Sequence, residues 1–191
     1  MKIIGKIKQF CFVALRIKKY EILSDCKNIF GKPIKHHPLL LKGKGKISFG
    51  KNVQIGVISS PCFYSHYAYL EARDEQSEII IGDNVSINNA FSIECSSKVV
   101  IENDVLIGVN CSIIDNDGHD LAIDKRKFGN PKTALVHIQQ NVFIGSNVTI
   151  LKGVIIGKNS IIGNSSVVTK NISENVIAAG NPAKVIRNLD H

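Results

Sequence analysis

The sequence contains no tryptophan and one methionine among its 191 residues, and aromatic residues make up only 6% of it. No apolar run approaches the roughly 18 residues that a membrane-spanning helix needs, so we expect no such helix. Cysteine occurs five times, but these residues form no CxxC pair and no spacing typical of zinc ligands. We therefore expect neither a disulfide framework nor a metal site. Reduced thiols favour a cytoplasmic location.

Acidic residues are scarce in the first quarter of the chain. Residues 1–51 contain 13 Lys or Arg against only Glu21 and Asp25, a net charge of +11, whereas the other 140 residues carry a net charge of −3. The basic character of the chain is thus a property of its N-terminal segment. A nucleic-acid binder usually interleaves basic residues with stacking aromatics over a whole domain. That pattern is missing, so no nucleic-acid partner is expected.

Isoleucine is the residue in excess, with 30 of 191 positions, and it is β-branched and favours strands. The isoleucines recur every six residues: 16 hexads have an aligned first residue, which is isoleucine in 12 of them. A period of six does not fit a helix of 3.6 residues per turn. The aligned residues are Phe49, Ile55, Pro61, Tyr67, Ile81, Ile87, Ile93, Ile101, Ile107, Ile113, Ile138, Ile144, Ile150, Ile156, Ile162 and Val168.

The residues between the aligned positions favour tight corners. Glycine often follows the aligned residue, and Asn or Asp often follows the glycine, as in Gly82-Asp83-Asn84. Both residue types tolerate the backbone conformations that a sharp bend requires. Short apolar strands with a corner every six residues predict an all-β fold, a parallel β-solenoid whose turns bury isoleucine against each other.

One long segment, residues 118–136, interrupts the repeats, and a loop that leaves a regular solenoid is usually functional. Asp115, Asp117 and His119 alternate at its start, so in an extended chain they point the same way. Histidine suits proton abstraction near neutral pH, and a carboxylate or backbone carbonyl on one ring nitrogen would fix its tautomer. On their own, these residues are a weak signal and favour a polar turn with a solvated histidine.

The hexads resemble the hexapeptide-repeat acyltransferases, particularly the sugar O-acetyltransferases, and so does the run from Asn141 through Lys170 to Arg187. The resemblance is closest over residues 136–187 and implies a left-handed parallel β-helix. We therefore expect three regions: a basic helix and lead-in over residues 1–46, the β-helix with its protruding loop over 47–175, and a C-terminal tail over 176–191.

The resemblance also implies roles for residues around the loop. His119 corresponds to the catalytic base, and Asn88 to an asparagine that lines the acceptor site. Members of the family carry an aspartate where Ser96 stands, so we expect Asp117, and after it Asp115, to orient the histidine. Arg126 in the loop and Tyr67 in the aromatic stretch are candidates for contacting the sugar.

The C-terminal half corresponds to the acyl-CoA site of the family. Phe143 would supply an apolar contact, and a backbone N–H at Gly145 or Ser146 would hold the oxyanion. Basic residues suit the nucleotide phosphates. The residues implied to bind the cofactor are Gly145, Ser146, Gly163, Asn164, Thr169, Lys170, Lys184 and Arg187.

We therefore predict an acetyl-CoA-dependent O-acetyltransferase acting on a sugar hydroxyl, in polysaccharide or glycolipid biosynthesis. As in the family, we expect a homotrimer with each active site between two subunits. An N-acetyltransferase of an amino nucleotide sugar and a non-catalytic solenoid scaffold are the alternatives. The zinc-dependent γ-class carbonic anhydrases share the coil, but their H-x-x-x-x-H spacing is absent, so no metal is expected.

The N-terminal segment has Ile3, Ile7, Phe10 and Ile17 at helical spacing, which predicts a helix over Lys2–Glu21. We expect this helix to pack on the first coil around Phe49 and Ile55, or against a partner subunit. The alternative is peripheral contact of residues 2–20 with an anionic membrane at its inner face.

Overall fold

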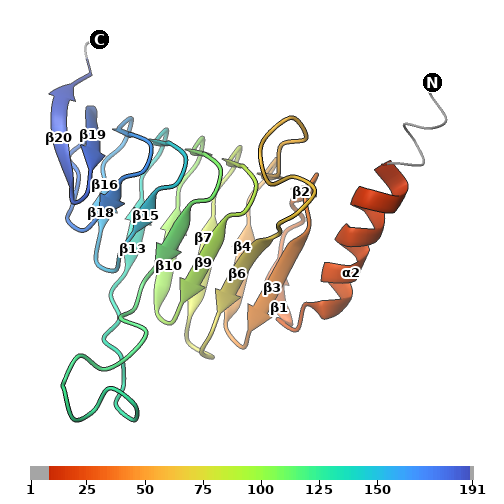
Figure 1. Cartoon of the computed structure of the whole chain (residues 1–191), viewed down its shortest axis with the longest axis horizontal. Helices are drawn as coiled ribbons and strands as arrows, with labels where there is room; N and C mark the ends of the chain where they lie inside the picture. The colour runs from red at the N-terminus through yellow and green to blue at the C-terminus, as the bar shows by residue number, and fades with distance from the viewer. Residues whose placement is uncertain (1–8, 190–191) are drawn as a thin grey trace.

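The computed structural model describes residues 9–189, which form a solenoid of parallel strands preceded by a helix (Figure 1). Each turn contributes one strand to each of three sheets, called A, B and C here in the order in which the chain visits them. Sheet A contains β1 (Asn28–Phe30), β4 (Lys46–Phe49), β7 (Glu78–Ile81), β10 (Lys98–Ile101), β13 (Val136–Ile138) and β16 (Ile155–Ile156). Sheet B contains β2 (Ile34–Lys35), β5 (Gln54–Ile55), β8 (Ser86–Ile87), β11 (Leu106–Ile107), β14 (Phe143–Ile144), β17 (Ile161–Ile162), β19 (Val176–Gly180) and β20 (Ala183–Asn188). Sheet C contains β3 (Leu39–Gly43), β6 (Ala68–Ala72), β9 (Ser92–Cys95), β12 (Ser112–Ile114), β15 (Thr149–Ile150) and β18 (Val167–Val168).

The core consists of aliphatic side chains stacked along the solenoid axis. Strand pairing places equivalent residues of successive turns in register, so each inward position becomes a ladder. In sheet C the ladder consists of Leu41, Leu70, Ile93, Ile113, Ile150 and Val168. Ile93 is fully buried. The period of six therefore predicts the buried face of the strands correctly.

Asparagines at the corners explain how the short strands can bend. Asn110 and Asn147 both have positive φ, of 57° and 59°, and the Asn110 Nδ2 donates to Asn147 Oδ1 at 2.9 Å. Asparagine is one of the few residues that adopts this left-handed conformation at modest cost. The corners are thus stacked by side-chain amides as well as by backbone pairing.

The solenoid is longer at its start than the hexads suggest. β1, β2 and β3 already pair in parallel with β4, β5 and β6, although they lie in the region expected to be a lead-in. In this first coil the paired residues Phe30 and Lys35 are five apart, whereas Lys35 and Leu41 keep the spacing of six. Its outer side leaves Ile29 and Phe30 exposed.

Two further expectations differ from the structure. Pro61 and Tyr67 continue the hexad grid in sequence, but they lie in an exposed loop, residues 56–67, and Leu70 occupies the core position instead. At the other end, β19 pairs with β17, so the solenoid continues into the expected tail. An antiparallel β19–β20 hairpin with a cis Asn181–Pro182 bond then ends it.

The N-terminal helix consists of a π-helical turn (Phe10–Ala14) and α2 (Leu15–Leu23); the expected start at Lys2 lies outside the described residues. α2 packs beside β3 and the 56–67 loop: the Tyr20 ring stacks on Tyr67 at 4.5 Å, and Arg16 Nη1 donates to the Phe63 carbonyl at 3.0 Å. Phe49 and Ile55 face the solenoid interior, so the expected packing around them is wrong. No helix within residues 9–189 has the length and hydropathy to cross a membrane.

Candidate active site

The long loop leaves the solenoid where sheet C passes into sheet A, between β12 and β13 (Figure 1). We call this corner of the solenoid the CA edge, and the corner where sheet B passes into sheet C the BC edge. The loop, residues 115–135, projects away from the coils, whereas the equivalent connection from β15 to β16 takes only residues 151–154. The extra chain therefore serves something other than closing the coil.

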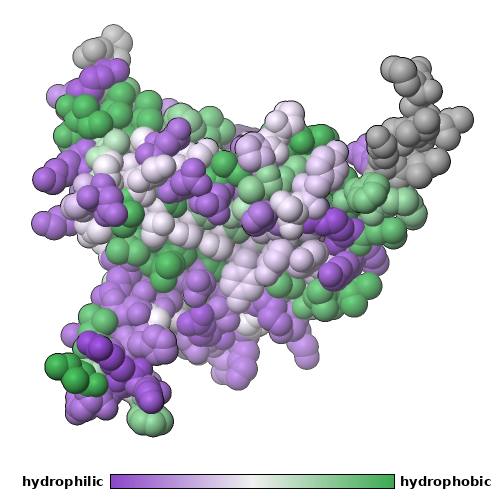
Figure 2. All heavy atoms as spheres, viewed as in Figure 1, coloured by the Kyte–Doolittle hydropathy of each residue, from purple (hydrophilic) through white to green (hydrophobic). Residues whose placement is uncertain are grey.

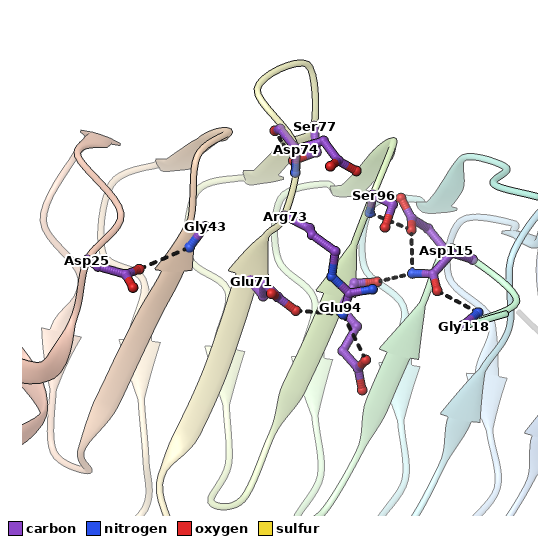
Figure 3. A network of polar contacts seen from close by, with 11 residues as sticks. Asp25, Gly43, Glu71, Arg73, Asp74, Ser77, Glu94, Ser96, Asp115 and Gly118 are labelled. Carbon is purple, nitrogen blue, oxygen red and sulfur yellow. Dashed lines mark hydrogen bonds and ion pairs between the residues drawn. The ribbon is translucent and has the colours of Figure 1, made fainter. Parts of the chain in front are cut away.

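A buried carboxylate fixes the start of the loop. The Asp115 side chain is fully buried and accepts a hydrogen bond from the Ser96 N–H at 2.7 Å (Figure 3). It accepts a second one from the Ser97 N–H, also at 2.7 Å. The Cys95 thiol donates to Asp115 Oδ2 at 3.3 Å, the oxygen that also accepts from Ser97. Burial, and then the nearby Asp115 carboxylate, raise the pKa of the Cys95 thiol, which keeps it protonated as a donor. The corner at Ser96, where the family carries an aspartate, therefore holds a carboxylate in this chain too, but it is supplied by Asp115 of the next coil.

The two legs of the loop are joined just beyond this anchor. Asn116 and Thr133 form an antiparallel bridge, and the Ala134 N–H donates to the Asp115 carbonyl at 2.9 Å. Asn116 also accepts from the Gly118 N–H through Oδ1 at 2.8 Å. The base of the loop is therefore a defined structure, and His119 follows it directly.

His119 is exposed, and its Nδ1 lies 3.2 Å from the Arg126 carbonyl on the far side of the loop. A carbonyl oxygen can only accept, so Nδ1 carries the proton and the neutral ring keeps its lone pair on Nε2. This is the tautomer that a general base requires. The backbone of Arg126, rather than its side chain, is what orients the ring.

Asp117 does not have the expected place beside the histidine. Its carboxylate pairs with Lys152 at 3.3 Å, on the next coil of the CA edge, and its N–H donates to the Lys132 carbonyl. The expectation that Asp117 orients His119 is therefore wrong, and Asp115 does not do so either, because it is turned inward. Lys152 was missed in the sequence analysis, although β12 and β15 pair in register and so bring the ends of the two strands together.

The outer face of sheet C, between the two edges, carries a polar cluster that sequence reasoning also missed. Arg73 Nη2 bridges Glu71 at 2.8 Å and Glu94 at 3.4 Å (Figure 3). Burial, and then Glu71, raise the pKa of Tyr69 to about 12, so its phenol is neutral. The alternation of buried and partly exposed residues along β6 and β9 would have indicated that Tyr69, Glu71 and Glu94 face outward. Hydroxyl, carboxylate and guanidinium groups together suit hydrogen bonding to a polyhydroxyl ligand.

Asn88 lies at the BC edge, on the opposite side of sheet C from the loop. A shallow groove of about 170 Å³ at this edge is lined by Asn88, Leu106, Gly108 and Phe143, among others. Phe143 is 45% exposed and forms part of its wall. The structure thus brings the predicted acceptor-site asparagine and the predicted apolar cofactor contact into one groove.

The predicted cofactor corners continue the same edge. Gly145 and Ser146 stack on Gly163 and Asn164 of the next coil: the Gly145 N–H donates to the Ile162 carbonyl, and the Ser146 N–H to Asn164 Oδ1, both at 2.8 Å. Because both N–H groups are already bonded within the coil, the expectation that one of them holds the oxyanion is wrong.

The remaining predicted residues are spread over both edges. Thr169 and Lys170 are exposed at the CA edge of the last coil, whereas Lys184 and Arg187 lie on β20 at the end of sheet B. Tyr67 lies at the BC edge one coil before Asn88, but its ring is stacked on Tyr20 of the helix. Within the described residues, no group of three or more His, Cys, Asp or Glu could hold a metal ion.

Two family models match the coils on either side of the loop. One, described as "Bacterial transferase hexapeptide (six repeats)", matches residues 136–170, and the other, "Hexapeptide repeat of succinyl-transferase", matches residues 98–118. Both matched ranges are built from the stacked hexads of the solenoid.

Curated relatives and a solved structure extend the similarity. A Staphylococcus aureus (strain COL) protein, provisionally named as an acetyltransferase, is 38% identical over 68% of this chain and 78% of its own length. A Saccharomyces cerevisiae protein, also provisionally named as an acetyltransferase, is 43% identical over 69% of this chain, and the chain spans only 63% of it. The structure of a galactoside acetyltransferase in complex with coenzyme A is 36% identical, with a TM-score of 0.59, over 72% of this chain and 64% of that one.

Proposed function

The chain belongs to the hexapeptide-repeat acetyltransferase family, whose fold is the left-handed β-helix, and on this premise we propose that it transfers an acetyl group from acetyl-CoA to a sugar hydroxyl. One observation carries the proposal. His119 stands at the start of the protruding loop, just after the segment that Asp115 anchors. Because its Nδ1 donates to the Arg126 carbonyl, the other ring nitrogen, Nε2, is free to accept a proton. A galactoside acetyltransferase complexed with coenzyme A is among the similar structures, which supports both donor and acceptor class.

In the proposed reaction, His119 Nε2 removes the proton of the acceptor hydroxyl while the hydroxyl oxygen attacks the thioester carbonyl carbon of acetyl-CoA. The carbon–sulfur bond of acetyl-CoA then breaks, and the imidazolium returns the proton to the departing thiolate. The products are the acetyl ester and free CoA. General-base catalysis of this kind contributes roughly 10²–10⁴-fold to the rate.

The cofactor is proposed to lie along the BC edge. Phe143 and the stacked corners at Gly145–Ser146 and Gly163–Asn164 offer an apolar wall and a narrow ledge for the pantetheine arm. Lys184 and Arg187 lie on β20 at the end of sheet B, where basic side chains would meet the nucleotide phosphates. Thr169 and Lys170 lie at the CA edge of the last coil, on the other side of sheet C, and are proposed to contact the same end of the cofactor.

The acceptor is proposed to lie over the outer face of sheet C, within reach of Asn88 on one side and the loop with Arg126 on the other. The Arg73 cluster supplies donors and acceptors for sugar hydroxyls there. Polysaccharide or glycolipid assembly in the cytoplasm is the proposed setting. Five free cysteines fit a reducing compartment.

We further propose a homotrimer. Within one chain, the cofactor corners lie at the BC edge and His119 lies beyond the CA edge, with sheet C between them. A neighbouring subunit that presents its BC edge to the loop would bring the two together. The separation of the two halves within one chain supports an active site shared between subunits.

Mass spectrometry of acetyl transfer to a panel of sugars, oligosaccharides and amino sugar nucleotides tests the acceptor class. We expect acetyl esters on glycans that carry only hydroxyl groups. Transfer to amines alone would instead show an N-acetyltransferase that uses the same base, and CoA binding without any transfer would favour a scaffold.

A further inference from the structure

The N-terminal end of the molecule exposes an unusual number of large apolar side chains. On the helix, none of the described residues is buried, and Phe12, Leu15 and Ile22 are 58%, 51% and 73% exposed. The outer side of the first coil adds Phe30 and Ile34, at 56% and 46%. We call this surface the end face; its exposed apolar residues are Phe10, Phe12, Leu15, Ile22, Leu23, Ile29, Phe30 and Ile34. Figure 2 shows apolar surface at this end of the molecule, beside charged side chains.

The helix geometry explains why these side chains face outward. Arg16 and Tyr20, one turn apart, hold the helix to the 56–67 loop through the Phe63 carbonyl and the Tyr67 ring. Leu15, Lys18 and Ile22 follow each other at intervals of three and four residues and so share one side of the helix. Lys18 is 69% exposed. The side of the helix that points away from the solenoid therefore carries two apolar side chains with Lys18 between them, and Lys18 pairs with Glu21.

The end face is also strongly basic. Residues 9–51 contain ten Lys or Arg against Glu21 and Asp25. Glu21 is bonded to Lys35 and Asp25 to Lys42, and these lysines hold the pKa of both carboxyl groups below the usual range. Both acids are therefore ionised at neutral pH, and the segment has a formal net charge of +8, although one of its lysines, Lys46, pairs with Glu78 outside the segment.

A groove of about 540 Å³ between the helix and the first coil has the same character. Ile29, Leu39 and Leu41 supply apolar lining, and Lys32, Lys35 and Glu21 supply charged lining, with Glu21 paired to Lys35. Apolar surface bordered by cations is thus found both on the helix and beside it.

The charge decides between two occupants of this surface. A second copy of the chain would bring two positive faces together, which is repulsive at short range. A lipid bilayer with anionic headgroups offers an apolar layer for the phenylalanine and isoleucine side chains and negative charge for the lysines. Buried apolar area and electrostatic attraction to anionic lipids are the two contributions that set the strength of such an attachment.

We propose that the end face docks on an anionic lipid surface, with the helix lying in the headgroup region. The last coil and the β19–β20 hairpin stand at the other end of the solenoid (Figure 1). In this orientation Lys170, Lys184 and Arg187 face bulk water and stay open to a soluble cofactor. The attachment does not depend on acetyl transfer, so the two can be tested separately.

Co-sedimentation of the full chain with vesicles tests this directly. Vesicles of phosphatidylcholine alone are compared with vesicles that contain one fifth phosphatidylglycerol, at low and high salt and under reducing conditions. We expect binding to the anionic vesicles that falls at least ~10-fold at high salt, because the lysine contribution is screened. We expect the double variant Leu15→Ser/Ile22→Ser to lose at least ~10-fold in binding, with unchanged acetyl transfer to a soluble acceptor.

Matched variants show whether the effect belongs to the end face. Val185→Ser/Ile186→Ser removes two apolar side chains that are 48% and 64% exposed at the opposite end, and it should bind vesicles normally. Lys18→Arg/Lys19→Arg keeps the charge and should also bind. Equal binding to neutral and anionic vesicles, or none to either, would overturn the proposal. So would a change in oligomeric state of the Leu15→Ser/Ile22→Ser variant without a change in vesicle binding, because the face would then be a contact between copies.

Discussion

His37 is a buried histidine that the proposed chemistry does not use. It is fully buried at the BC edge beside Phe63, and its Nε2 donates to the Cys62 carbonyl at 3.3 Å. Within the described part of the chain, its Nδ1 is buried without a hydrogen-bond partner. Burial lowers the pKa of His37 from 6.5 to about 4, and the positive charge of Arg16 adds to the effect. The folded protein therefore holds this ring neutral.

The depressed pKa makes stability depend on pH. Between pH 6.5 and pH 4 the unfolded chain binds a proton at His37 that the folded chain does not. The contribution of His37 is thus complete above pH 6.5 and is lost as pH falls toward 4, by about 3 kcal/mol in all. We expect urea unfolding at several pH values to show a steeper decline for the wild type than for His37→Phe. Parallel curves would show that the pKa of His37 is the same in the folded and unfolded chain.

At the scale of structural elements, the hexads predicted most strands of sheets A, B and C in the coils that have neighbours on both sides. They failed at the ends, where β1 and β20 pack against one neighbour and the spacing relaxes. They also placed Tyr67 in the core, where Leu70 lies instead. The 56–67 loop inserts residues between two strands, and the six-residue count continues through the loop and so does not reveal it. Sequence could place His119 at the start of a loop, but Arg126 as its partner depends on how the loop closes.

Asp115 anchors the protruding loop, and its replacement should destabilise the fold. In Asp115→Asn an amide NH2 replaces one acceptor oxygen, so the N–H of Ser96 or Ser97 loses its buried partner. We expect a loss of about 1–3 kcal/mol in the free energy of unfolding, measured by urea denaturation. Glu174→Gln removes a carboxylate from an exposed pair with Lys158 and should change stability by less than about 0.5 kcal/mol. Equal effects would show that Asp115 has no special structural role.

At the scale of the whole molecule, the two halves of the proposed site lie on opposite sides of sheet C. If neighbouring subunits complete each other's sites, His119→Ala chains and Asn164→Trp chains should be inactive alone and active when mixed. Random mixing in equal amounts leaves about one quarter of the sites with an intact loop facing an intact corner. Activity near a quarter of the wild-type value after joint refolding would support the shared site. No recovery would place the site within one chain, as would a fully active monomer in solution scattering.

The central claim is that His119 acts as the general base in acetyl transfer, and turnover of the His119→Ala variant tests it most directly. With the accepted glycan as substrate, we predict a kcat at least ~100-fold below that of the wild type, with unchanged CoA affinity by calorimetry. His66→Ala, which removes an exposed imidazole from the 56–67 loop, should keep full activity. Wild-type turnover by the His119→Ala variant would contradict the account.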